Sequence, residues 1–173
     1  MGMELLADEE LGVFYSEADL RRSRREHLED TIYILPWVAT VDAFQHWIYS
    51  HPGHSADERR AAWLDVSDRF SGGVVDWTGL DEERAFAWHR QLHIFEYPFY
   101  YIEYGIAQLG ALQLWVKARQ NRAEALAGYK RALALGGSRP LPELFAAAGL
   151  EFDFSERTIA PLVDAVGEAL ADL

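Results

Sequence analysis

The longest helical pattern of the chain begins at Ser16 and continues to Ile48, with apolar residues at intervals of three and four. This spacing places the apolar side chains on one face of an α-helix. Ser16 and Asp19 have the spacing of a capping box, in which side chains bond the free amides of the first helical turn. We expect Pro36 to kink this helix, because proline lacks the amide that the helical ladder requires.

Start signals of the same kind recur along the chain and agree with the apolar spacing that follows them. Further helices are expected over residues 55–70, 78–92, from Pro98 onward, 121–135, 142–148 and from Ser155 onward. A strand-like alternation of period two is confined to residues 150–154. The sequence therefore predicts an all-α fold, a single array of about seven helices. Residues 1–173 are expected to form one domain, which is either complete or half of a larger one.

Composition and charge exclude some classes of binding partner and indicate where the protein is found. The net charge is −12, which disfavours DNA and RNA, because phosphate binding requires clustered cations. The basic run from Arg21 to Arg25 is interpreted as a solvated helix face. The longest apolar run, residues 32–39, is too short to cross a membrane. The chain has no cysteine, and its first ten residues do not resemble a signal peptide, so a cytoplasmic location is expected.

The segment from His93 to Gly105 gathers one histidine and four tyrosines. On a helix, Tyr97, Tyr101 and Tyr104 would share a face, and His93 would join them if the helix were unbroken. Tyrosine hydroxyls and an imidazole on one wall can donate hydrogen bonds to an oxyanion. Peptide hydrolysis creates such an oxyanion when the carbonyl becomes tetrahedral. The segment therefore offers a set of candidate donors to an oxyanion.

Three blocks of sequence carry a resemblance to a known family. They are residues 36–47, residues 99–111 and residues 135–150, together with the tyrosine-rich segment. In this order they resemble the C-terminal part of the thimet oligopeptidase and oligoendopeptidase F family of zinc metallopeptidases. The resemblance implies a helical metallopeptidase fold and the hydrolysis of short peptides.

The resemblance also implies roles for single residues. Tyr101 and Tyr104 match the tyrosines with which the family binds the transition state, and His93 matches its substrate-contacting histidine. Tyr97 and Tyr100 are candidates for lining the substrate site. For each of these residues the alternative is a packing role in the core, because aromatic side chains bury large areas.

The zinc ligands of the family are missing from the sequence. The family holds zinc with an HExxH helix and a later glutamate, and no HExxH is present here. The segment from His89 to His93 has two histidines at the right spacing, but Arg90 stands where the general base belongs. Glu4 lies near the expected third ligand, although the resemblance aligns it with a non-ligand. The chain is therefore expected to hold no catalytic zinc and to be inactive alone.

Two further groups of residues are weaker candidates for chemistry. His46, His51 and His54 have metal-like spacing but lie across a helix end and a turn, with no suitable carboxylate. Glu96 and Glu103 could face each other as an acid pair, but nothing nearby indicates glycoside chemistry. Trp37, Trp47, Trp63, Trp77, Trp88 and Trp115 are interpreted as packing residues.

Three functional interpretations stay open from the sequence. The chain is part of a zinc endopeptidase, a peptide- or protein-binding module derived from one, or half of a split enzyme whose N-terminal half carries HExxH. A peptide is the expected substrate in the parent family. A homo-oligomer is expected too, because a face that meets a missing half would expose apolar side chains.

Overall fold

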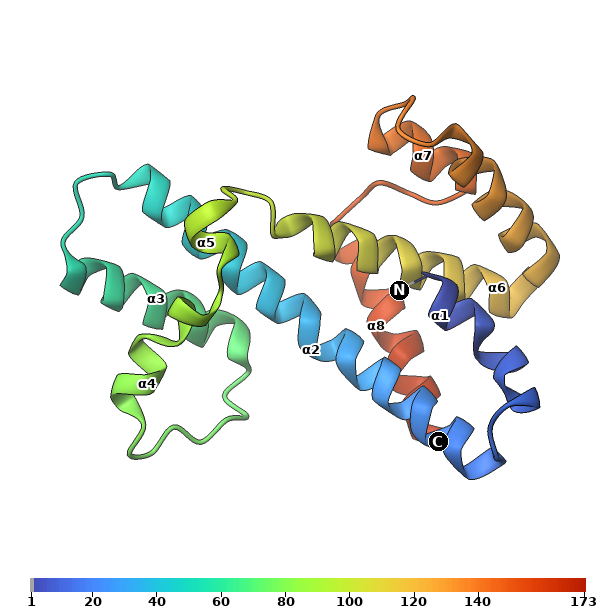
Figure 1. Ribbon diagram of the computed structural model, residues 1–173, viewed down its shortest axis with the longest axis horizontal. Helices are drawn as coiled ribbons and strands as arrows, with labels where there is room; N and C mark the ends of the chain where they lie inside the picture. The colour runs from blue at the N-terminus through green and yellow to red at the C-terminus, as the bar shows by residue number, and fades with distance from the viewer. Residues whose placement is uncertain (1) are drawn as a thin grey trace. The chain divides into compact units, whose positions relative to one another are not determined.

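The computed structural model describes residues 2–173, apart from the side chains of residues 8 and 9. These residues form eight α-helices, two short 3₁₀ helices and no strand, which confirms the predicted all-α class. The elements are α1 (Gly2–Ala7), η1 (Asp8–Val13), α2 (Glu17–Ser50), α3 (Ala56–Ser71), α4 (Asp81–Ala85), η2 (Ala87–Arg90), α5 (His93–Glu96), α6 (Ile102–Leu135), α7 (Leu141–Ala148) and α8 (Glu156–Ala171) (Figure 1). Within the described residues, no helix is both long enough and apolar enough to cross a membrane.

The chain divides into two compact units. The central unit comprises residues 33–105, and the terminal unit comprises residues 2–32 and 106–173. The helix α2 starts in the terminal unit and ends in the central one, and it is continuous through Pro36. The helix α6 belongs to the terminal unit from residue 106 onward.

Three of the predicted helix starts are confirmed by their hydrogen bonds. The Asp19 amide donates to Ser16 Oγ at 3.2 Å. Ser55 and Glu58 form a reciprocal capping box, with the Ser55 amide 2.8 Å from the Glu58 carboxylate. The Glu124 amide donates to Asn121 Oδ1 at 3.2 Å. Asn121 has a non-helical backbone, with φ −151° and ψ 89°, so α6 is two helices joined at a kink.

The predicted helix over residues 78–92 is wrong in its extent. Thr78 does not begin a helix, and its amide donates a hydrogen bond to Asp76 Oδ1 at 2.9 Å. The chain instead forms α4, η2 and α5 in succession. The Arg84 carbonyl accepts a hydrogen bond from Trp63 Nε1 at 2.9 Å. A continuous helix would give that carbonyl to the amide four residues later, so a tertiary contact replaces the helical bond.

The expected position of Pro98 in the first helical turn is also wrong. Pro98 lies in the turn between α5 and α6, and α6 begins only at Ile102. Phe99 has a φ of 58°, a left-handed conformation that is uncommon for a residue with a side chain. The tyrosine-rich segment is therefore broken in the middle.

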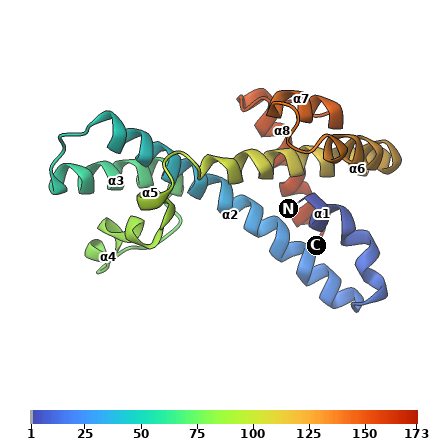
Figure 2. The same cartoon turned by 45° about the horizontal axis from the view of Figure 1, so that its top comes forward.

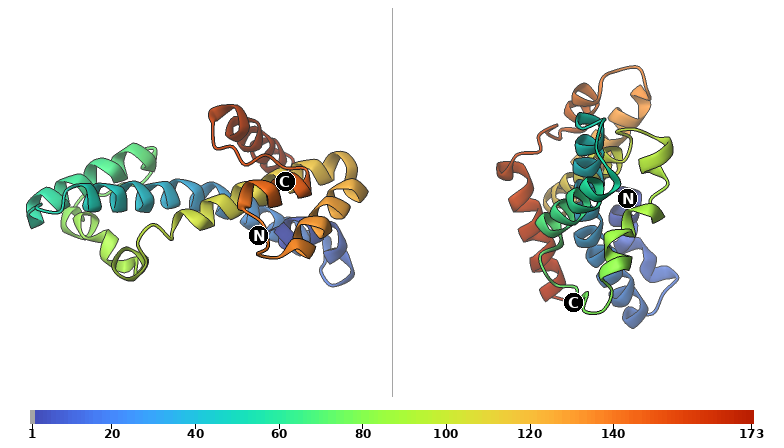
Figure 3. Two further views of the ribbon diagram at one scale, coloured as in Figure 1. Left: turned by 90° about the horizontal axis from the view of Figure 1, so that it is seen from above. Right: turned by 90° about the vertical axis from the view of Figure 1, so that its left-hand side faces the viewer.

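An aromatic core holds the central unit together. In Figures 1 and 3, α3 runs back beside the second half of α2. The side chain of Trp63 on α3 is buried and meets Phe44 on α2 edge to face, with ring centroids 5.2 Å apart. Trp88 also packs on Phe44, with ring centroids 5.5 Å apart. Buried aromatic pairs of this kind contribute energy beyond the area they bury.

The terminal unit is built around α6, and α7 folds back along its second half (Figure 2). Leu114 and Ala125 of α6 are buried together with Leu6 of α1. A buried polar contact also lies in this unit, where the Gln108 amide donates to the Thr31 hydroxyl at 3.1 Å.

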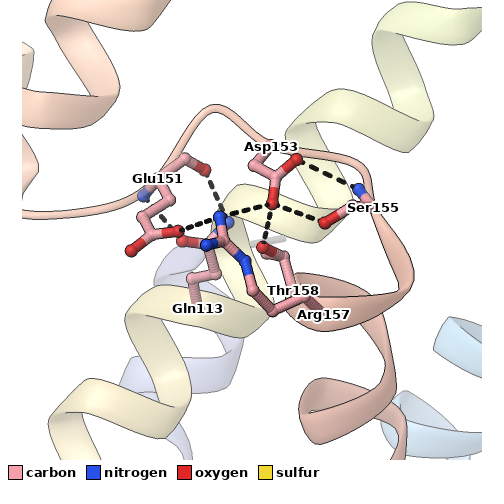
Figure 4. A network of polar contacts seen from close by, with 6 residues as sticks. All are labelled: Gln113, Glu151, Asp153, Ser155, Arg157 and Thr158. Atoms are coloured by element: carbon pink, nitrogen blue, oxygen red, sulfur yellow. Dashed lines mark hydrogen bonds and ion pairs between the residues drawn. The ribbon is translucent and has the colours of Figure 1, made fainter.

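The connection between α7 and α8 is fixed by polar contacts, not by strand pairing (Figure 4). Asp153 accepts from the hydroxyls of Thr158 and Ser155, and these bonds hold the pKa of its carboxyl well below the usual value. Gln113 on α6 bonds both the amide and the carbonyl of Glu151, at 2.8 and 2.9 Å. The suspected strand-like segment is therefore an irregular loop that is bonded to two helices.

Gly128 of α6 lies directly against the backbone at the end of α7. A Cβ added to Gly128 would lie 2.5 Å from the Ala148 carbonyl oxygen. We expect Gly128→Ala to lower the free energy of unfolding by about 1–3 kcal/mol, because the backbone at this position must shift. Gly167→Ala in α8 is the matched control, since nothing lies within 4 Å of its added Cβ. It should raise stability by about 0.5–1 kcal/mol. Urea unfolding followed by circular dichroism measures both, and equal effects would contradict the packing.

Candidate site around His93

The five residues that the sequence singled out lie together within the central unit. His93 is the first residue of α5, and Tyr97 follows α5 directly. Tyr100 and Tyr101 end the turn that precedes α6, and Tyr104 lies in the first turn of α6. The ring centroid of His93 is 5.0–6.1 Å from those of all four tyrosines. The predicted clustering therefore occurs, although the residues come from two helices and the turn between them and not from one helix.

A line of hydrogen bonds passes through His93. Its Nε2 lies 3.3 Å from the Tyr104 hydroxyl, and its Nδ1 lies 2.7 Å from Gln91 Nε2. The other end of the Gln91 amide, Oε1, accepts from Trp37 Nε1 at 3.2 Å. Both nitrogens of the imidazole are thus bonded, which fixes the orientation of the ring.

The tyrosines differ in how far they reach the solvent. Tyr101 is 8% exposed and packs in the core of the central unit. Burial raises the pKa of its hydroxyl above the ordinary value, and the nearby Trp37 indole acts in the opposite direction. Tyr104 is partly buried, whereas Tyr97 and Tyr100 are 51% and 50% exposed. The cluster is therefore buried at Tyr101 and exposed to solvent at Tyr97 and Tyr100.

Gln45 positions this cluster and was missed in the sequence. It is fully buried on α2, and its amide donates to the carbonyls of His93 and Tyr97 at 3.3 and 3.4 Å. These bonds link both ends of α5 to α2. One signal was available: Gln45 stands in the apolar stripe of α2, four residues after Val41 and one after Phe44. A polar side chain at a core position needs a partner.

Gln91 and Trp37 were also missed as parts of the site. Gln91 lies in an irregular stretch where no periodic pattern marks it, and Trp37 was interpreted only as a packing residue. The Trp37 ring is covered by the Arg90 guanidinium at 4.4 Å from its centroid. Arg90, which stands between the two histidines of the His89–His93 segment, thus contacts an aromatic ring in this structure.

The described side chains do not fit a zinc site. Among them, with residues 8 and 9 left aside, no three from His, Cys, Asp or Glu are grouped so that they could hold a metal ion. His89 packs on Trp88 with ring centroids 4.1 Å apart, whereas the two ring nitrogens of His93 face Gln91 and Tyr104. Glu4 lies 3.7 Å from His27 in the terminal unit.

The other histidine candidates have aromatic and backbone partners. His51 and His54 contact the Trp47 ring, and His51 Nδ1 lies 2.8 Å from the Trp47 carbonyl. His46 packs on Phe99 and lies 3.6 Å from the Asp42 carboxylate. Glu96 and Glu103 are both exposed.

Comparison with known proteins places these features in a family. The sequence pattern described as peptidase family M3 matches residues 1–163. The structure of PZ peptidase A with an inhibitor is 32% identical, with a TM-score of 0.89, and the match covers 99% of this chain and 30% of that one. An X-ray structure assigned as an oligoendopeptidase F is 34% identical, with a TM-score of 0.78, over 90% of this chain and 28% of the other.

A third structure, a Bacillus anthracis protein assigned as an oligoendopeptidase F, is 28% identical, with a TM-score of 0.74. That match covers 99% of this chain and 27% of the other, so this chain spans less than a third of the length of each of the three structures. No curated protein matches the sequence. Because the family pattern extends over nearly the whole sequence, the chain belongs to peptidase family M3.

Proposed function

We propose that this chain supplies the substrate-binding side of a zinc oligoendopeptidase, with His93, Tyr101 and Tyr104 acting on the scissile peptide. The observation that carries the proposal is the cluster itself, in which four tyrosine rings surround His93 and the Tyr104 hydroxyl lies 3.3 Å from its Nε2. Membership of a peptidase family supports the assignment to peptide hydrolysis.

The role proposed for each tyrosine follows from the solvent exposure of its side chain. Tyr104 is the residue whose hydroxyl donates to the carbonyl oxygen as it gains negative charge. Tyr97 and Tyr100 offer half-exposed rings against which peptide side chains pack. Tyr101, which is mostly buried, holds the other rings in place and adds a second hydroxyl at the base of the site.

Zinc chemistry would come from a segment other than residues 1–173. The sequence contains no HExxH, and the described residues offer no three-ligand group. We therefore assign no zinc-dependent step to this chain. That same observation favours a second candidate function, a module that binds peptides without cutting them.

The chain alone is expected to bind short peptides without cleaving them and to contain no stoichiometric zinc. Isothermal titration with a short unstructured peptide measures binding, chromatography of the incubated peptide measures cleavage, and elemental analysis measures zinc. Stoichiometric zinc with chelator-sensitive cleavage would contradict the expected inactivity, and the absence of saturable binding would contradict the peptide-binding role.

A pair of tyrosines provides the control for this binding. Tyr100 and Tyr15 are 50% and 51% exposed, but only Tyr100 belongs to the cluster. Tyr100→Ala should weaken peptide binding about 2- to 10-fold, because an aromatic contact is lost. Tyr15→Ala should leave the affinity unchanged. Equal affinities for the two variants would place the binding surface elsewhere.

A further inference from the structure

We infer that Trp37 and Gln91 are positioning residues that hold His93 as the tautomer protonated at Nε2 and so turn the hydroxyl proton of Tyr104 toward a ligand. The use of the Tyr104 proton rests on the proposed function, whereas the arrangement itself is argued from three hydrogen bonds within the central unit. These bonds run from Trp37 to Gln91, from Gln91 to His93, and from His93 to Tyr104.

The first step fixes the Gln91 amide. An indole N–H can only donate a hydrogen bond, so the Gln91 atom that faces Trp37 Nε1 at 3.2 Å must be the carbonyl oxygen. The amide nitrogen then faces the other way, toward His93 Nδ1 at 2.7 Å. The oxygen and nitrogen of a glutamine side chain are assigned from such networks. Trp37 therefore decides which end of the amide His93 meets.

The second step fixes the imidazole. An amide NH₂ group can only donate, so His93 Nδ1 must accept and carries no proton. A neutral imidazole then has its proton on Nε2, the nitrogen that faces the Tyr104 oxygen at 3.3 Å. His93 consequently donates to Tyr104.

The third step concerns the proton of Tyr104. Since the hydroxyl oxygen receives a proton from His93, its own O–H does not need to point at His93. That O–H remains available to a carbonyl or an oxyanion. In the other tautomer, which is protonated at Nδ1, Nε2 would accept a hydrogen bond from Tyr104. The hydroxyl proton of Tyr104 would then point at His93 and not at a ligand. The orientation of one amide thus decides whether Tyr104 can act as a donor.

The three hydrogen bonds from Trp37 to Tyr104 form a relay, and packing holds Trp37 at its start. Trp37 meets the buried Trp63 edge to face at 6.0 Å, and the Arg90 guanidinium covers its ring at 4.4 Å. Arg90 also donates to the Tyr33 hydroxyl at 3.4 Å. The indole is therefore fixed between a core ring and a surface cation, and its N–H direction is preset.

The test reads the tautomer of His93 directly, by nitrogen-15 NMR of the imidazoles of the whole chain at pH 8, with His93→Gln used to assign the signals. The wild type should show His93 protonated at Nε2. Gln91→Glu should move the proton to Nδ1 or add one there, because both carboxylate oxygens accept. Gln120→Glu, which adds the same charge on the exposed surface of α6, should leave His93 unchanged.

A second variant keeps the inference testable if Gln91→Glu fails to fold. Trp37→Phe removes the N–H that orients the amide while keeping an aromatic ring, so His93 should populate both tautomers. A wild-type His93 protonated at Nδ1 would overturn the inference. So would a folded Gln91→Glu or Trp37→Phe variant with the wild-type pattern.

Activity separates this inference from the proposed function. In a chimera where this chain replaces the matching segment of PZ peptidase A, Gln91→Glu should lower kcat about 10- to 100-fold, with little change in KM. A switched tautomer with unchanged kcat would leave the relay intact and remove the oxyanion role. An unswitched tautomer would remove the relay, whatever the activity.

Discussion

Tyr104→Phe is expected to lower kcat about 10²–10³-fold in a peptidase that contains this chain, or roughly 3–4 kcal/mol of transition-state stabilisation. The hydroxyl that is lost is the one that lies 3.3 Å from His93 Nε2. Because a donor to the oxyanion acts mainly in the transition state, KM should change much less than kcat. Tyr104 is only partly buried, so the variant should stay folded.

The measurement uses the same chimera, in which the PZ peptidase A segments outside the match provide the rest of the enzyme. Cleavage of a quenched fluorescent peptide gives kcat and KM for each variant. Tyr15→Phe, in the terminal unit and half exposed, is the control and should keep the activity of the parent chimera. A Tyr104→Phe variant with the parent kcat would mean that Tyr104 only packs or caps.

Trp63→Ala is expected to reduce the free energy of unfolding of the central unit by about 3–5 kcal/mol. The side chain is 1% exposed and contacts both Phe44 and Trp37. Its removal also leaves the Arg84 carbonyl without the indole donor that ends α4. Domains of this size have a free energy of unfolding of only about 5–15 kcal/mol, so the variant should lose a large part of its stability.

Trp77→Ala is the matched control for this variant. Trp77 is less buried and lies in the loop between α3 and α4, so its loss should cost far less. Urea unfolding followed by circular dichroism and tryptophan fluorescence measures both variants. The loss of Trp63 should also disturb the His93 cluster, because Trp63 supports Trp37. Equal stability losses at the two positions would contradict the assignment of Trp63 to the core.

Helix starts were predictable because the groups that form them are neighbours in the chain. The bonds of Asp19 to Ser16, of Glu58 to Ser55 and of Glu124 to Asn121 each span three residues. Their geometry depends on local backbone conformation alone, and the side-chain types that make them are few. The all-α class follows from the same local signals together with the apolar spacing.

The gathering of His93 with the four tyrosines was also predictable, but the reason for it was not. Residues within one short segment stay close whether or not the helix is continuous. The break at Phe99, with a φ of 58°, carries no glycine that would have marked a left-handed position. The difference in exposure between Tyr101 and Tyr100 likewise depends on which neighbours cover each ring.

Only the tertiary structure decided how the site is supported. The Trp37–Gln91 bond joins residues 54 apart, and the Gln45–His93 bond joins residues 48 apart. The end of α4 depends on an indole that lies 21 residues earlier. Such bonds form because the packing of α2 against α3 and α5 brings the partners together. Local composition determined where helices can begin, while competition between helical and long-range hydrogen bonds determined where they end and which atoms face the site.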